Sequence, residues 1–271
     1  MMWGCGGNIF EADCTVLLLN EFILCLTGIM LSSHYLNVFN PAAPTEKGEQ
    51  TRNTILESAL QLFREKGFDA TTMRDVAAQA RVALGAAYYY FPSKEAIIQS
   101  YYEVVQAEHS RRVSDSLAGD TMDLKQRIQL AMQSKLDIVQ NDRKLLGVVF
   151  RYSGEPSHPL SCLGQATAQT RRESIEVFSR AIGEERLPRD LQQLLPIALW
   201  ALQMGVLILF IYDDTPNQKR TRKLVDGALD LTVRFLSIAK NPLLKPIRSK
   251  VLSLLRETEL LPDFQFTRET P

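Results

Sequence analysis

Apolar residues recur every three or four positions along most of the chain after residue 50, and the alternation typical of strands is nearly absent. The first such segment runs from Thr51 to Lys66 and is expected to end at Gly67. Two short helices are predicted over residues 73–80 and 83–90, followed by a long helix over 94–116. Further helical patterns cover approximately residues 121–140, 142–152, 160–183, 189–212, 217–240 and 244–257. The pattern therefore predicts an all-α fold.

Two residues mark expected breaks or starts in this pattern. Ser93 is the expected N-cap of the long helix over 94–116, because its hydroxyl can accept a hydrogen bond from a free backbone N–H of the first turn. Pro196 lies inside the helix predicted over 189–212 and is expected to kink it or to mark a late start.

The N-terminal part contains an apolar run over residues 15–31, which is marginal in length for crossing a bilayer. Asn20 and Glu21 lie near its middle, and no Lys or Arg precedes Lys47, so the cationic start of a signal peptide is missing. Three interpretations stay open. The run is a membrane anchor or signal, or it is a loosely attached amphipathic extension, or it is upstream sequence included by a misplaced start. The first interpretation is the least favoured. For the third, Met30 is a later candidate start.

Residues 40–50 are rich in proline and in small and polar residues, which predicts a linker. Residues 1–48 are therefore expected to be an N-terminal extension that is poorly ordered or partly helical.

Composition narrows the class of protein. The chain has 271 residues, of which 45% are hydrophobic and 23% are charged, with 31 Lys and Arg balanced by 31 Asp and Glu. These values exclude a disordered chain, a collagen-like repeat and a polytopic membrane protein. A net charge of zero argues against nucleic acid as a partner at first sight, but it averages unlike parts: residues 217–250 carry nine bases and two acids.

Catalytic and metal sites are not expected. The four cysteines form no CxxC pair, and the three histidines lie far apart. The sequence has no GxSxG motif and no glycine loop that cradles phosphate. We therefore expect no enzyme, no metal and no cofactor. Because the chain after residue 25 is nearly free of cysteine, a reducing cytoplasm is the expected compartment.

The most informative segment covers residues 71–94, TTMRDVAAQARVALGAAYYYFPSK. It predicts two short helices joined by a tight turn, with Thr72 as N-cap of the first. Small residues at 77, 78, 80, 86 and 87 let the two helices cross closely. This is the geometry of a helix-turn-helix, whose second helix enters the major groove of DNA. We expect inward positions at Val76, Ala77, Ala80, Val82, Ala87 and Phe91.

The same segment offers candidate contacts to DNA. Successive residues of a helix lie about 100° apart, so the three tyrosines at 88–90 cannot all be buried, and Tyr88 or Tyr89 is expected to be exposed. Tyrosine hydroxyls suit phosphate oxygens, an outward Gly85 permits close approach, and Lys94 lies in a first helical turn that suits phosphate. The candidate DNA-binding residues are Arg52, Thr72, Arg74, Leu84, Gly85, Ala86, Tyr88, Tyr89 and Lys94.

These motifs resemble the DNA-binding domain of the tetracycline-repressor-like (TetR) regulators. The resemblance rests on R-x-x-I-L-x-x-A-x-x-L-F-x-x-x-G-F from residue 52, T-T-M-R-D-V-A from 71 and Y-Y-Y-F-P-S-K-E from 88, and it covers about 50 residues. It implies an N-terminal three-helix DNA-binding domain and a C-terminal helical bundle that binds a small-molecule effector and forms a homodimer. The domains expected are 49–97 for DNA binding, 98–242 for effector binding and dimerisation, and 243–271 for a C-terminal helix and tail.

The sequence departs from the family pattern where DNA is read. Arg81 stands where the turn usually carries glycine, and a left-handed arginine costs on the order of 1 kcal/mol. Ala83, Leu84 and Ala86 replace the usual polar residues at the start of the second helix. Two functions stay open: a repressor that binds operator DNA and is released by a small, apolar effector, and a helical ligand-binding or interaction protein whose DNA-reading surface has decayed.

The rest of the chain supports less specific predictions. Residues 194–214 are apolar nearly all round, which predicts a helix buried on several sides, and this helix and the one over 221–239 are expected to form a four-helix dimer interface. The basic cluster at 219–223 is interpreted as a solvated face, and a membrane partner is not expected. Candidate residues of the effector pocket are Phe150, Tyr152, His158, Trp200, Gln203 and Met204.

Overall fold

The computed structural model describes residues 45–119, 121–152, 155 and 157–257. Contacts divide the chain into two units, Met1–Gln50 and Thr51–Pro271, and of the first only the residues from 45 onward are described. The apolar run at 15–31 and its three interpretations therefore lie outside the described residues. Within the described ranges every regular element is helical, so the all-α prediction is confirmed.

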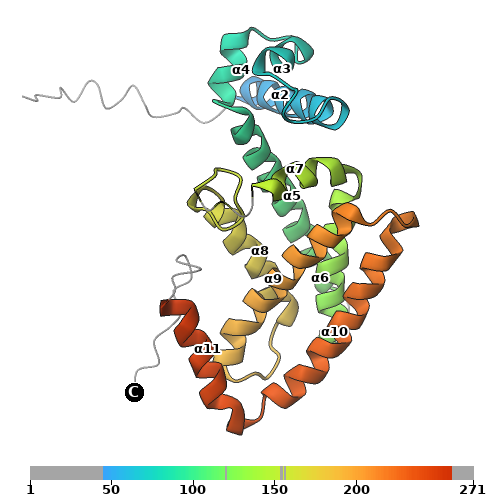
Figure 1. Ribbon diagram of the computed structural model, residues 1–271, viewed down its shortest axis with the longest axis vertical. Coiled ribbons are helices and arrows are strands. Elements are labelled where there is room, and N and C mark those ends of the chain that lie inside the picture. The colour runs from blue at the N-terminus through green and yellow to red at the C-terminus, as the bar shows by residue number, and fades with distance from the viewer. Residues whose placement is uncertain (1–44, 120, 153–154, 156, 258–271) are drawn as a thin grey trace, which may run out of the picture. The chain divides into compact units, whose positions relative to one another are not determined.

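The first three described helices are α2 (Glu46–Glu65), α3 (Met73–Gln79) and α4 (Leu84–Tyr90) (Figure 1). They pack around a small core in which Ile55, Ala59, Val76, Ala77, Ala87 and Phe91 are buried, so the inward positions predicted for the motif are confirmed, with Val82 half-buried in the turn. Gly67 ends α2 with a φ of 90°, as expected.

The helices that follow are α5 (Lys94–Leu117), α6 (Leu124–Val139), α7 (Arg143–Arg151), α8 (Ala168–Ile182), α9 (Arg189–Tyr212), α10 (Lys219–Ala239) and α11 (Lys245–Glu257). Helix α5 packs against α6 and α8, α8 packs against α9, and α10 packs against α6 and α9. Ser93 caps α5 as predicted, its hydroxyl accepting a hydrogen bond from Ala96 N at 3.2 Å.

Two predicted boundaries are wrong. Helix α2 begins at Glu46, so part of the expected linker over 40–50 is helical; Glu46 and Glu49 favour a helix start because they carry negative charge in its first turn. The helix expected over 160–183 begins only at Ala168, after turns and a short 3-10 helix, Gln165–Thr167. Helix α9 has the predicted bounds and continues through Pro196, which excludes the late start, and the kink at Pro196 stays a prediction.

The C-terminal helix α11 is docked on α9. Its Arg248 donates a hydrogen bond from Nε to Asp190 Oδ2 at 2.6 Å, and both side chains are buried. The same guanidinium group also bonds to the backbone oxygens of Ala239 and Asn241, so every charge in this buried pair is hydrogen-bonded.

Candidate DNA-binding surface and effector pocket

The turn between α3 and α4 keeps the shape of a helix-turn-helix although glycine is absent from it. Arg81 adopts a φ of 57°, the left-handed conformation expected for this position. Val82 N donates to Ala77 O at 3.0 Å and Arg81 N donates to Ala78 O at 3.2 Å, the two hydrogen bonds that close a helix end of this kind. The turn is therefore strained at one residue but regular in its hydrogen bonding.

Replacing Arg81 by glycine is expected to stabilise the domain. Arg81 is exposed, and its left-handed backbone costs about 1 kcal/mol that glycine avoids, partly offset by the greater freedom of glycine in the unfolded chain. We expect Arg81→Gly to raise the free energy of unfolding by about 0.5 kcal/mol, measured by urea denaturation. Arg74→Gly, in the first turn of α3 where the backbone is right-handed, is the matched control and should lower it by up to about 1 kcal/mol. An equal loss in both variants would contradict a strained turn.

Helix α3 begins with a capping box, which confirms Thr72 as N-cap. Asp75 N donates to Thr72 Oγ1 at 3.2 Å, and Thr72 N donates to Asp75 Oδ2 at 2.9 Å. The Thr72 hydroxyl also donates to the same carboxylate at 2.8 Å. The helix start already holds an anion, so the phosphate contact of Thr72 stays a prediction that requires this hydroxyl to change partner.

The outward face of α4 is uncovered. Leu84 is 37% exposed, Tyr88 50% and Tyr89 82%, while Ala87 points inward with no exposed surface. Gly85 is exposed, with nothing within 4 Å of the place where a Cβ would stand. Ala83 forms no side-chain cap, as expected, and Ala86 is half-buried. The exposed tyrosines are as predicted, and the face is apolar and aromatic, without a charged side chain on α4.

Two of the three candidate cations are engaged within the fold. Lys94 Nζ donates to Phe68 O at 2.7 Å and lies 4.5 Å from the centroid of the Phe68 ring. Arg52 bonds to the Ser100 hydroxyl and lies 5.0 Å from the Phe91 ring centroid. Arg74 is exposed. All three phosphate contacts stay predictions, and the first two require a change of partner.

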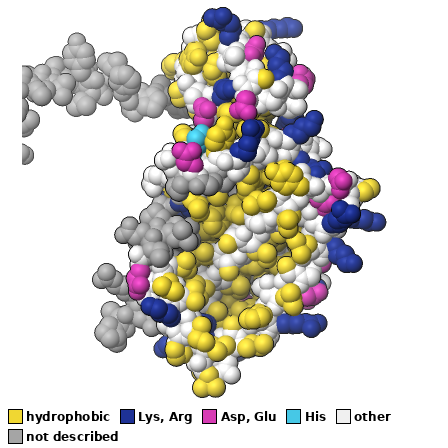
Figure 2. Space-filling view, viewed as in Figure 1, with side chains coloured by type: hydrophobic (Ala, Val, Ile, Leu, Met, Phe, Trp, Pro, Cys, Tyr) yellow, Lys and Arg dark blue, Asp and Glu magenta, His cyan; other side chains and the backbone are white. Residues whose placement is uncertain are grey.

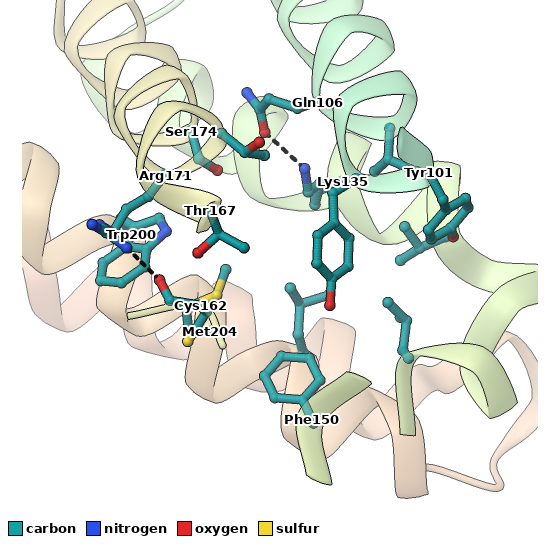
Figure 3. Close-up of a pocket in the computed structure, with 16 residues that line it drawn as sticks. Tyr101, Gln106, Lys135, Phe150, Cys162, Thr167, Arg171, Ser174, Trp200 and Met204 are labelled. Carbon is teal, nitrogen blue, oxygen red and sulfur yellow. Dashed lines mark hydrogen bonds between the residues drawn. The ribbon is translucent and has the colours of Figure 1, made fainter. Parts of the chain in front are cut away.

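A cavity of about 110 Å³ lies between α5, α6, α7, α8 and α9 (Figure 3). Three of the six candidate pocket residues, Phe150, Trp200 and Met204, line this cavity. The other three lie outside its lining. Tyr152 stacks on His158 with ring centroids 4.0 Å apart, and the Gln203 amide is fully buried without a hydrogen-bond partner among the described residues.

The polar side of this cavity was not predicted from the sequence. Its lining includes Tyr102, Gln106, Lys135, Thr167, Arg171 and Ser174. Figure 3 shows Gln106, Lys135 and Ser174 gathered on one side and Phe150 on the other. A signal was available, because Lys135 follows Ile128 and Met132 at helical spacing on the buried face of α6, where a lysine is out of place. The lining is therefore partly polar, and the apolar character expected of the effector stays a prediction.

Burial lowers the pKa of Lys135 to about 7, because desolvation disfavours the ammonium form. Between about pH 7 and pH 10 the unfolded chain then binds a proton that the folded chain lacks, so this residue makes stability rise with pH. We expect the free energy of unfolding of the wild type to rise across this range relative to Lys135→Met, measured by urea denaturation at fixed pH values. A constant difference between the two proteins would show that Lys135 titrates normally.

A hydrogen-bonded chain joins the cavity to α2. Tyr101, which lines the cavity, donates from its hydroxyl to Asp142 Oδ2 at 2.8 Å. The other oxygen of Asp142 accepts from Arg64 Nε at 2.6 Å, and Arg64 belongs to α2. The hydrogen bond and charge of Asp142 raise the pKa of Arg64, and burial raises that of Tyr101. Asp142 thus connects a cavity-lining side chain with the helix-turn-helix domain.

Helices α9 and α10 expose an apolar stripe, visible in Figure 2 as hydrophobic side chains gathered over both helices. On α10, Leu231 is 64% exposed and Phe235 71%, with Leu224 and Ile238 exposed in the same register. On α9 the exposed positions are Ala198, Ala201, Gly205, Ile208, Leu209 and Tyr212. Helix α9 is also long and apolar enough to cross a membrane, but half of that window is buried in the fold, so this is weak support for a span.

Comparison with protein families matches two parts of the chain. Residues 55–101 match the family "Bacterial regulatory proteins, tetR family", and residues 127–251 match "Tetracyclin repressor-like, C-terminal domain". The transcriptional activator FasR of Mycolicibacterium smegmatis is 24% identical over 208 residues, covering 72% of this chain and 87% of that protein. The regulator TtgR of Pseudomonas putida is 31% identical over 78 residues, covering 29% of this chain and 37% of that protein.

Other curated relatives match over short segments. The chain spans 20% of the length of YuxN and 25% of that of YerO, two uncharacterised transcriptional regulators of Bacillus subtilis. Among solved structures, a TetR-family regulator from Syntrophomonas wolfei superposes with a TM-score of 0.55 at 21% identity, covering 67% of this chain and 94% of that one. One from Nitrosomonas europaea gives 0.54 at 20% identity, covering 66% and 96%. Both matches support the fold.

The two family matches cover the helix-turn-helix and most of the helical domain behind it, and the geometry of α3, α4 and their turn agrees with them. The chain belongs to the TetR family of transcriptional regulators.

Proposed function

We propose that this protein is a homodimeric repressor that binds operator DNA through α4 and is released from it by a small-molecule effector bound between α5 and α9. The observation that carries the proposal is the uncovered face of α4: Tyr88 and Tyr89 project from a helix whose other side is packed into a helix-turn-helix. Such a face suits phosphate and sugar contacts and the methyl groups of thymine. A cytoplasmic location follows from this function.

Dimerisation is proposed from the exposed stripe on α9 and α10. Its small residues on α9 let a second helix approach closely, and its large apolar residues on α10 repeat at helical spacing. In a two-fold dimer the same stripe from each chain meets its copy, which forms a four-helix interface. The interface would also set the distance between the two α4 helices, which must match major grooves about 34–36 Å apart.

Release by an effector is proposed from the chain Tyr101–Asp142–Arg64. A ligand in the cavity touches Tyr101, and any movement of that hydroxyl changes the geometry of Asp142 and hence its pairing with α2. Helix α5 begins shortly after α4 in the sequence and lines the cavity, so a tilt of α5 moves Tyr101 and the start of the helix next to α4 together. A ligand acts in this way only if it binds the two arrangements with different affinities.

A second function is kept because of one observation: α4 carries no charged or amide side chain that reads base edges, and its N-cap is an alanine. On this alternative the protein binds a ligand or a protein partner and no longer recognises an operator. The sign of regulation is likewise part of the proposal, since FasR is named an activator and KstR2 of Rhodococcus jostii a repressor.

Titration of labelled duplexes from the DNA flanking the protein's own gene separates the two functions. Binding at nanomolar protein, tighter than to a scrambled duplex and weakened at least about tenfold in Tyr88→Ala, supports the proposed function. Binding no tighter than micromolar at low salt supports the alternative. Because residues 49–96 carry six acids and six bases, we expect a weak salt dependence of the non-specific component.

A further inference from the structure

Lys135 is a buried cation whose surroundings supply no negative charge. Its side chain lies in the lining of the cavity and is 8% exposed as a residue. Nζ donates to Gln106 Oε1 at 2.9 Å, a neutral acceptor, and among the described residues no carboxylate pairs with it. Burying an ammonium group without a counter-charge is costly in free energy. Such a residue lowers the stability of the fold unless another interaction compensates for the missing negative charge.

The other ionisable groups around Lys135 are neutral or positive. From α5 come Tyr101, Tyr102 and His109; burial raises the pKa of both tyrosines and lowers that of His109 to about 3, so all three are uncharged at neutral pH. Helix α8 contributes Arg171, and the segment before it contributes Cys162. Helices α7 and α9 contribute apolar or neutral side chains such as Leu146, Phe150 and Met204. The lining therefore has two potential cations and no acid.

A second polar group in the lining has an unused donor. The hydroxyl of Tyr102 is buried and has no hydrogen-bond partner among the described residues. The lining also holds Ser174, which lies beside Gln106 in Figure 3, and Thr167, whose hydroxyl already donates to the backbone oxygens of Ser161 and Gly164. The lining also includes the apolar side chains of Val139, Leu146 and Phe150, and Figure 3 shows Phe150 on the side away from Gln106 and Ser174. The cavity is thus amphipathic, with a positive, hydrogen-bond-donating side and a hydrocarbon side.

We propose that the cavity binds a small monocarboxylate, whose carboxylate pairs with Lys135 and accepts the Tyr102 hydroxyl hydrogen and whose hydrocarbon part lies against Val139, Leu146 and Phe150. The volume of about 110 Å³ limits the size of this ligand. A cavity of about 150 Å³ accommodates benzene, so a chain of about four carbons, as in butanoate, is the largest that fits without expansion, and hexanoate requires the lining side chains to move apart. This inference deepens the proposed effector site; only its regulatory meaning rests on the proposed function.

Calorimetric titration of the DNA-free protein with hexanoate and with hexanamide tests the charge directly, because the two ligands differ little in shape. At pH 7 the wild type is expected to bind hexanoate at least about tenfold more tightly than hexanamide, as a charge-assisted hydrogen bond predicts. Lys135→Met should weaken hexanoate binding at least about tenfold and leave hexanamide binding equal or tighter. Equal affinity for both ligands in the wild type, or no binding of any linear carboxylate from butanoate to octanoate, would overturn the proposal.

The matched control is Lys125→Met, the same substitution on the same helix. Lys125 is partly exposed and pairs with Asp230 at 2.7 Å, away from the cavity lining. The Lys125→Met variant should bind hexanoate with the same affinity as the wild type. A parallel loss in both variants would show a general effect of lost charge and would count against the proposed pair.

The pH dependence of the wild type gives a test that needs no variant. Free Lys135 loses its proton above about pH 7, whereas the carboxylate complex requires the ammonium form. The hexanoate dissociation constant should therefore rise from pH 7 to pH 9, by up to about tenfold per pH unit, and that of hexanamide should not. A flat hexanoate profile would overturn the proposal. Because no DNA is present, failure here is distinct from failure of operator binding.

Discussion

Replacing Leu84 by glutamate is expected to abolish operator binding while leaving the protein folded. Leu84 is the first residue of α4 and is 37% exposed, so a glutamate carboxylate at this position can reach solvent while its methylene groups cover part of the surface that Leu84 buries. A negative charge in the first turn of a helix stabilises it by about 0.3–1 kcal/mol. The same charge facing phosphates is repelled, and like charges at an interface cost several kcal/mol. We expect the dissociation constant for operator DNA to rise at least about 100-fold, measured by fluorescence anisotropy.

The control for this prediction is Leu243→Glu, the same substitution at a leucine that is exposed just before α11. It adds the same charge and should leave DNA affinity within about twofold of the wild type. Thermal unfolding of both variants checks that the loss of binding is not a loss of fold. If Leu84→Glu bound DNA as the wild type does, α4 would not be the element that faces the duplex.

Replacing Leu231 by glutamate is expected to convert the proposed homodimer into a monomer. Leu231 is 64% exposed in the single chain, at the middle of the apolar stripe on α10 and beside a groove lined by Leu195, Thr232, Phe235, Leu236 and Ala239. In a two-fold interface one substitution acts twice, and each glutamate has to be desolvated among apolar side chains. We expect the dimer dissociation constant to rise at least about 100-fold, measured by sedimentation equilibrium.

Loss of the dimer should also weaken the binding of operator DNA. A monomer engages one half-site, so operator affinity should fall together with dimerisation, whereas the cavity and its ligand binding should be unaffected. Leu243→Glu again serves as control, because it places the same charge outside the stripe. A Leu231→Glu protein that remained dimeric would show that the stripe has another occupant.

The fold was largely predictable because helical periodicity depends on local spacing. Exposure of Tyr88 or Tyr89 was expected simply because three successive residues of a helix cannot all be buried, and both are exposed. The starts of α2 and α8 were missed for a different reason. Charged first-turn residues such as Glu46 resemble linker composition, and the turns before Ala168 are held by Thr167 bonding to Ser161 O and Gly164 O, contacts that no periodicity encodes.

The sites were less predictable than the fold because long side chains choose partners that are distant in sequence. Lys94 and Arg52 were assigned to phosphate from their positions alone, yet Lys94 bonds to Phe68 O, 26 residues away, and Arg52 bonds to Ser100, 48 residues away. Asp142 was overlooked because its two partners, Arg64 and Tyr101, lie on different helices. Lys135 was detectable in principle, since its charge interrupts the buried face of α6.

The connection through Asp142 gives the proposed release mechanism a physical basis. Asp142 is buried and accepts one hydrogen bond from the cavity side and one from α2, so it cannot follow a displaced Tyr101 without lengthening its bond to Arg64. A carboxylate bound beside Tyr102 would act one residue from this contact. Coupling between two such sites is typically worth about 1–3 kcal/mol, which is enough to change operator affinity about 5- to 150-fold.

A footprint of the purified protein on the DNA flanking its own gene tests the central claim most directly, namely that two α4 faces of one dimer read an operator. The account predicts two protected half-sites with centres one helical turn apart, about 34–36 Å, at nanomolar protein. Protection should disappear with Leu84→Glu and persist with Leu243→Glu. A single unpaired protected patch, or no protection at micromolar protein and low salt, would contradict it.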